Sequence, residues 1–168
     1  MKKPTIVQDL WQLSEEELAH RFLTGKPPDL AAWSDQKLFG SLLRLSHWER
    51  RAAPLRLFWR VTTAAGLWLW TGKRFWLSDA GRYLATNLMG SYRWPIRALT
   101  MHLELATSLL APPKKVLSVQ YDRQENPRFV YPVRDELVEV ETGVMLGRML
   151  WQRKNQIQPL LWFALQRR

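Results

Sequence analysis

Apolar and polar residues alternate along short stretches in the C-terminal part of the chain, and turn-forming residues separate these stretches. A repeat of two positions is typical of a strand with one buried face. The clearest pair covers residues 129–141 and 144–152, which Thr142 and Gly143 connect. A two-residue connection that contains glycine is typical of a tight hairpin. The pattern therefore predicts an antiparallel sheet.

Eight stretches of the chain fit the strand pattern. They are residues 38–45, 72–78, 82–89, 98–110, 116–121, 129–141, 144–152 and 160–165. Eight antiparallel strands can close into a barrel whose interior holds packed side chains or one small ligand. We therefore expect a mainly β fold, an eight-stranded antiparallel up-and-down barrel.

Two parts of the chain depart from the strand pattern. Ser14 precedes Glu17 at the spacing of a capping box, which predicts the start of a helix. This helix either plugs or braces one end of the barrel or packs on its outside. Between residues 48 and 66 the apolar spacing becomes helical, which indicates a helix or an irregular crossover. We divide the single domain into a helix and linker, residues 1–30, and a barrel, residues 31–168.

The charge of the chain is uneven. The net charge is +10, and residues 37–97 contain 11 basic and 2 acidic side chains. A basic region attracts an anionic ligand, a nucleic acid or an anionic membrane surface, or it is a solvated surface with no partner. The oligomeric state is left open by these features.

The sequence lacks the residues that several kinds of chemistry require. The chain has no cysteine, so it offers neither a disulfide, nor a thiolate, nor a zinc site built on cysteine. It also lacks a phosphate-binding glycine-rich loop, a nucleophile motif and a cluster of metal ligands. We therefore expect no cofactor and no metal.

The distribution of apolar residues also indicates where in the cell the protein is found. The N-terminal residues lack the apolar core of a signal peptide. The longest uncharged part of the most hydrophobic stretch, residues 61–70, is about half a bilayer span. We therefore expect a cytoplasmic protein without a transmembrane segment.

The predicted hairpin carries the first candidate for chemistry. If Thr142 and Gly143 form the turn, Glu136 faces Met149 and Arg134 faces Trp151 on a mostly apolar side of the pair. In apolar surroundings two opposite charges favour an ion pair, and an unpaired carboxylate has a raised pKa.

Alternatives for the hairpin stay open. The charges of Glu136 and Arg134 can form a structural buried pair, or a longer turn can direct both to solvent. In a register shifted by one residue, Asp135 and Arg148 become the candidates instead, because such a shift exchanges the two faces of a strand.

A second candidate lies in residues 98–110. His102 and Glu104 share one face of this stretch, and that spacing can place a catalytic base beside the group that orients it. The alternative is that their face is simply the solvated one. Glu136, His102 and Glu104 are thus the candidate proton-transfer residues.

The chain contains ten tryptophans, and flat aromatic walls suit flat ligands. The candidate lining residues are Trp70, Phe75, Met149, Trp151 and Trp162. Four other tryptophans lie in the basic middle part of the chain and are candidates for a cavity entrance or an interface: Trp48, Trp59, Trp68 and Trp94. The alternative is that the aromatic residues only fill the interior. Lys73 and Asn87, on neighbouring predicted strands, can offer a charge and a hydrogen bond to a ligand's polar end, or can be surface residues.

Several fragments of the chain resemble segments of lipocalin-like, or calycin, proteins. They are residues 70–75, Asn87, residues 121–122 and 126–127, residues 134–137, Gly143, residues 146–148 and residues 163–165. The resemblance implies an up-and-down barrel with a central cavity for an apolar or amphipathic molecule. It also implies a superfamily that includes carriers, chromophore-handling proteins and some cyclases or isomerases. The chain departs from secreted lipocalins because it lacks disulfide cysteines and an early Gly-x-Trp motif.

Two function classes follow from these features. The first is a lipocalin-like protein that binds a small apolar or aromatic molecule with an acidic group, either as a carrier or as a cofactor-free isomerase or cyclase in biosynthesis. The second is a basic, aromatic-rich barrel that binds nucleic acid, a protein or a membrane surface. The absence of a recognisable nucleic-acid motif counts against nucleic acid as the partner.

Overall fold

The computed structural model describes residues 6–46, 69–91, 93–154 and 156–167. The helices are α1 (Ile6–Gln12), α2 (Glu15–Thr24) and α3 (Leu30–Trp33). The strands are β1 (Lys37–Leu45), β2 (Trp70–Leu77), β3 (Tyr83–Gly90), β4 (Pro95–Thr107), β5 (Lys115–Gln120), β6 (Val133–Glu141), β7 (Val144–Arg153) and β8 (Gln156–Gln166). A short 3-10 turn, Arg128–Val130, precedes β6.

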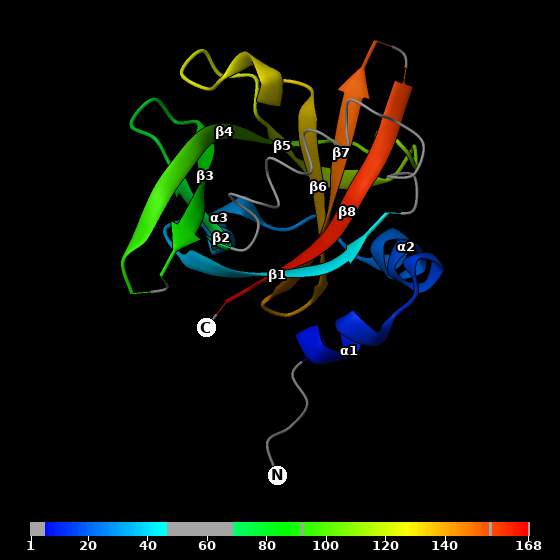
Figure 1. The fold of residues 1–168 in the computed structure, drawn as a ribbon. Coiled ribbons are helices and arrows are strands. Elements are labelled where there is room, and N and C mark those ends of the chain that lie inside the picture. The colour runs from blue at the N-terminus through cyan, green and yellow to red at the C-terminus, as the bar shows by residue number, and fades with distance from the viewer. Residues whose placement is uncertain (1–5, 47–68, 92, 155, 168) are drawn as a thin grey trace.

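The strands form a closed antiparallel barrel in chain order, and β8 pairs with β1 to close it (Figure 1). The predicted up-and-down barrel is confirmed. The helix or crossover expected at residues 48–66 lies outside the described residues, as do Trp48, Trp59 and Trp68. No helix in the described ranges is long and apolar enough to span a bilayer.

The capping box predicted from the sequence opens α2. The Ser14 hydroxyl accepts a hydrogen bond from the backbone N–H of Glu17, and the Glu17 carboxylate accepts one from the backbone N–H of Ser14. Figure 1 shows α1 and α2 outside the barrel wall. Leu18 and Phe22 of α2 are buried there against outward-facing residues of β6, β7 and β8. Of the two expected positions, the helix therefore takes the outer one.

The short helix α3 closes one end of the barrel. The Trp33 side chain is fully buried and belongs to the interior core. The guanidinium of Arg167, near the end of the chain, lies 3.9 Å from the Trp33 ring and donates a hydrogen bond to the Ala32 carbonyl. The helix α3 and Arg167 thus lie together at what we call the Trp33 end.

Two glycines allow aromatic rings to cross the barrel interior. A Cβ atom at Gly147 would collide with the ring of Phe163 on β8, and one at Gly40 would collide with the ring of Trp70. The two rings then meet edge to face with their centroids 5.6 Å apart, a favourable aromatic geometry. The interior is therefore shaped by close contacts that only glycine permits.

The opposite end, which we call the Trp94 end, carries the β3–β4 and β7–β8 hairpins and the β5–β6 loop. The Asn126 side chain fixes this loop by bonding to the N–H and C=O of Thr100 and to the C=O of Tyr121. These bonds replace ladder bonds beside an irregularity in β4, where Leu99 has a φ of 61°.

The β6–β7 hairpin turns at Thr142 and Gly143 as expected, but its register differs from the predicted one. Asp135 pairs with Met149, and Glu136 pairs with Arg148. A bulge between Glu139 and Glu141 causes the difference, because one extra residue on one strand shifts every later pair. The faces expected for the charged residues of β6 change accordingly.

Candidate functional site

Lys73 of β2 and Asn87 of β3 are direct cross-strand neighbours inside the barrel. The Lys73 Nζ donates a hydrogen bond to the Asn87 Oδ1 over 2.8 Å. Only 2% of the Lys73 surface is exposed, which is rare for lysine unless its charge is paired. The structure thus brings these two predicted residues together.

Tyr121 and Asp135 complete a buried polar cluster with Lys73 and Asn87. The Lys73 Nζ lies 2.9 Å from the Tyr121 hydroxyl and 2.9 Å from the Asp135 Oδ2. The Tyr121 hydroxyl donates to the same Asp135 oxygen over 2.8 Å. We call these four residues the Lys73 cluster.

The hydrogen-bond capacity of the Lys73 cluster is almost completely used. The three Nζ protons of Lys73 match three acceptors, on Asn87, Tyr121 and Asp135. The exception is Asp135 Oδ1, which is buried and has no hydrogen-bond partner within the described residues. An unpaired buried acceptor costs about 1–3 kcal/mol, and more when it is charged. Asp135 Oδ1 can therefore still accept a hydrogen bond from one donor.

The electrostatics of the Lys73 cluster keep Tyr121 protonated. Loss of solvation by burial, followed by the negative charge of Asp135 and its hydrogen bond, raises the pKa of the Tyr121 phenol well above its ordinary value of 10. The charges of Lys73 and Asp135 compensate each other within the barrel. At neutral pH the cluster thus presents a phenol O–H beside a carboxylate.

The walls around the Lys73 cluster are apolar and aromatic. Met101 and Phe163 border the ammonium group, with the Met101 sulfur 3.7 Å from Nζ and the centre of the Phe163 ring 5.9 Å from it. Phe75, a predicted lining residue, is also fully buried in the interior core.

Burial differs between the two ends of the barrel. At the Trp33 end, Trp33, Leu38 and Phe75 are fully buried, and Leu30 and Tyr83 of the same core are partly buried. Toward the Trp94 end several interior residues are only partly buried: Leu42, Trp70, Asn87, Leu99, Tyr131, Met149 and Trp151. Asn87 belongs to both this half-buried layer and the Lys73 cluster, so the layer extends as far as the cluster.

Glu136 and Arg148 lie on the outer wall, beneath α2. The Arg148 guanidinium bonds twice to the Glu136 Oε2, at 3.0 and 2.8 Å, and once to the Ser108 hydroxyl. The other Glu136 oxygen accepts the backbone N–H of Leu109. The guanidinium also lies 4.4 Å from the Phe22 ring. This network fastens α2 and the β4–β5 loop to the barrel and does not face the interior.

Four more of the predicted site residues lie on the outer wall: His102, Glu104, Arg134 and Trp162. His102 is next to Arg123, and Glu104 bonds to Gln120. Arg134 bonds to Gln152 rather than to Glu136. Trp162 packs edge to face against Phe22, outside the barrel. None of these five described side chains, Glu136 included, contacts the Lys73 cluster.

Tyr121 is not among the site residues that the sequence predicts, and Asp135 is a candidate only in a register shifted by one residue. Both have a signal in the sequence: Asp135 is in phase with buried Val133 and Leu137, and Tyr121 is in phase with Val119. A charged residue at an inward position of a strand needs a partner. Lys73 is such a partner, because it is in phase with buried Phe75 on β2 and therefore also points into the barrel. The described residues contain no group of three or more side chains that could hold a metal ion.

Comparisons with known proteins support the fold alone. No family model matches the chain, and no curated protein matches it. One solved structure, described as "Crystal structure of protein from Thermomonospora curvata", is similar over 93% of this chain and 88% of that chain, with a TM-score of 0.58 and 17% sequence identity. The similarity supports the closed eight-stranded barrel and does not single out the lipocalin-like family.

Proposed function

We propose that the barrel binds one small, mostly apolar or aromatic molecule that carries a hydrogen-bond donor, and that Asp135 anchors this donor. The observation that carries the proposal is the buried Asp135 Oδ1, which lacks a partner within the described residues. A ligand N–H or O–H at this oxygen removes the cost of the unpaired acceptor. Such a role agrees with the lipocalin-like resemblance of the sequence.

The surroundings of the Lys73 cluster support a largely apolar ligand. Phe163 and Met101 border the cluster, and half-buried Trp70, Met149 and Trp151 lie toward the Trp94 end. Binding sites for small molecules are mostly lined by apolar and aromatic side chains with a few placed polar groups. An acidic ligand is less suited than a donor, because the Lys73 protons are already matched to acceptors.

Two probes that differ in one group test this proposal. N-phenyl-1-naphthylamine is apolar and aromatic and carries one N–H, whereas 1-phenoxynaphthalene has an ether oxygen in its place. A hydrogen bond to a charged group is worth about 1.5–3 kcal/mol, so we expect the amine to bind roughly 10- to 150-fold more tightly. Fluorescence titration measures both affinities and the stoichiometry, which we expect to be one.

Two variants test whether Asp135 causes the difference in affinity between the two probes. In Asp135→Asn the two probes should bind with similar affinities, whereas Glu104→Gln, on the exposed outer face, should keep the wild-type preference for the amine. Circular dichroism checks that each variant is folded. Equal affinities of the unchanged protein for both probes would remove Asp135 as the anchor, and absence of binding of either probe would overturn the proposal.

The Lys73 cluster also supports a second candidate, a cofactor-free isomerase or cyclase. The phenol of Tyr121 stays protonated, and the neighbouring Asp135 carboxylate can accept a proton. In such a reaction Asp135 Oδ1 takes a proton from one atom of the substrate and returns it to a second atom, while Tyr121 keeps its own proton and its hydrogen bond to Asp135. Incubation in deuterated water of a ligand recovered from the protein tests this: catalysed deuterium uptake that Asp135→Asn abolishes is expected, and uptake at the uncatalysed rate would refute it.

A further inference from the structure

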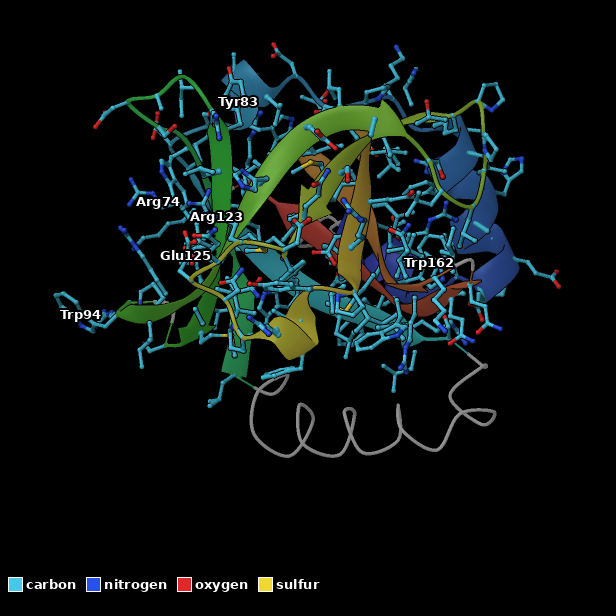
Figure 2. All side chains as sticks on the ribbon, turned by 90° about the horizontal axis from the view of Figure 1, so that it is seen from above. Arg74, Tyr83, Trp94, Arg123, Glu125 and Trp162 are labelled. Atoms are coloured by element: carbon cyan, nitrogen blue, oxygen red, sulfur yellow. The ribbon has the colours of Figure 1, made fainter. Side chains whose placement is uncertain are left out.

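The β3–β4 hairpin carries the two most exposed large apolar side chains in the described part of the chain. Trp94 is 85% exposed and Ile96 is 71% exposed. Figure 2 shows Trp94 projecting away from the barrel. Leu69 is 53% exposed. It precedes Trp70, which pairs with Met89 near the end of β3. Exposed apolar groups that cluster in this way mark an interaction surface.

Positive charge gathers at the same end of the barrel. The exposed cations in its described hairpins and loop are Arg93, Arg97, Arg128, Arg153 and Lys154. The exposed acidic residues there, Asp122 and Glu125, are already matched: Asp122 lies 4.0 Å from Arg134 and Glu125 lies 2.6 Å from Arg123. The Trp94 end therefore has an excess of positive charge.

The Trp33 end lacks this excess. Its exposed charged residues are Asp29, Asp35, Asp79 and Glu141 on the acidic side, and Arg21, Lys26, Lys37, Arg82 and Lys115 on the basic side. These charges nearly balance, so the electrostatic field of the described residues is more positive toward the Trp94 end. A negatively charged surface would orient the molecule with this end first.

We propose that the β3–β4 hairpin docks on the surface of an anionic lipid bilayer. Trp94 and Ile96 enter the interface, while Arg93 and Arg97 contact the lipid headgroups. Indole rings favour the interface of a bilayer, and cations near an anionic leaflet each contribute to binding. A lipid surface fits better than a nucleic acid because exposed aliphatic residues such as Ile96 and Leu69 gain little from stacked bases but gain from burial in the interface.

This proposal does not depend on the ligand of the barrel.

Co-sedimentation of the full chain with vesicles tests the docking. One set contains phosphatidylcholine alone, and the other adds phosphatidylserine at roughly one part in four to supply negative charge. We expect binding to the anionic set only, and a loss of binding when salt is added, because surface charges are screened.

Two pairs of exposed residues provide matched variants. Trp94→Ala should lower the partition coefficient roughly tenfold, because the indole loses its burial in the interface. Trp11→Ala removes a tryptophan that is 60% exposed on α1 and should have no effect. Arg93→Glu should lower the coefficient more than fivefold, since each cation contributes roughly fivefold. Arg82→Glu, at the Trp33 end, should retain most of the binding.

The outcomes separate membrane docking from other uses of the surface. Equal binding to neutral and anionic vesicles, or unchanged binding of Trp94→Ala, overturns the proposal. Absence of vesicle binding together with salt-sensitive binding of single-stranded DNA assigns the surface to nucleic acid instead. Absence of binding to both also overturns it.

Discussion

The buried ion pair of the Lys73 cluster makes a quantitative prediction about stability. Lys73→Met keeps the length and the apolar stem of the side chain but removes the ammonium group. Asp135, which is fully buried, then loses the donor at 2.9 Å and keeps only the Tyr121 hydroxyl. Removing one partner of a buried ion pair costs about 3–5 kcal/mol. We expect a loss in this range, about a third or more of the free energy of unfolding of a typical domain.

Urea unfolding followed by circular dichroism measures this loss. Lys37→Met is the matched control, because Lys37 is exposed at the start of β1 and does not enter the barrel; its effect should stay within about 0.5 kcal/mol. The double variant Lys73→Met/Asp135→Asn also removes the unpaired negative charge, so it should recover about 2 kcal/mol relative to Lys73→Met alone.

A small effect would refute the reasoning. If Lys73→Met costs less than about 1 kcal/mol with an unchanged denaturant slope, the ammonium does not compensate a buried carboxylate. Recovery in the double variant is the second requirement, since it separates an unpaired charge from a simple loss of packing.

Three further predictions concern separate parts of the fold. Ser14→Ala removes the cap of α2 and should cost about 1 kcal/mol in thermal or urea unfolding; no change would mean that the capping box does not stabilise α2. The raised pKa of Tyr121 gives a stabilisation that is complete below a pH near 10, where the unfolded chain ionises, and is lost as the pH rises toward the folded-state value. Absorbance of the phenolate should therefore show Tyr121 ionising only when the protein unfolds, and reversible ionisation of Tyr121 in the folded protein would contradict this. Gly147→Ala places a methyl group against the Phe163 ring and should cost about 1–3 kcal/mol of the free energy of unfolding, whereas an unaffected variant would show that the ring moves freely.

The sequence was sufficient to predict the barrel because the strand signals were local. The alternation in β5, β7 and β8 and the capping box of α2 depend only on neighbouring residues. The closure of one end depends instead on a long-range contact between Trp33 and Arg167. A short helix of four residues that ends in a buried tryptophan has no local pattern that would predict its position.

The candidate site was only half predictable for a related reason. Lys73 and Asn87 were expected on neighbouring strands as groups for a ligand's polar end, and the structure places them in contact with each other. The inward position of Asp135 depended on the register of β6, which the bulge near Glu139 sets. A shift of one residue exchanges the inner and outer faces of a strand, so Glu136 lies outside the barrel and Asp135 lies inside it.

The most direct test of a ligand in the barrel is native mass spectrometry of the protein purified gently from its own host, followed by denaturing extraction. We predict one small, mostly apolar molecule with an N–H or O–H group per chain, and a lower occupancy in Asp135→Asn than in the Glu104→Gln control. A bare protein, or an equal occupancy in both variants, would contradict the role of Asp135 as the ligand anchor.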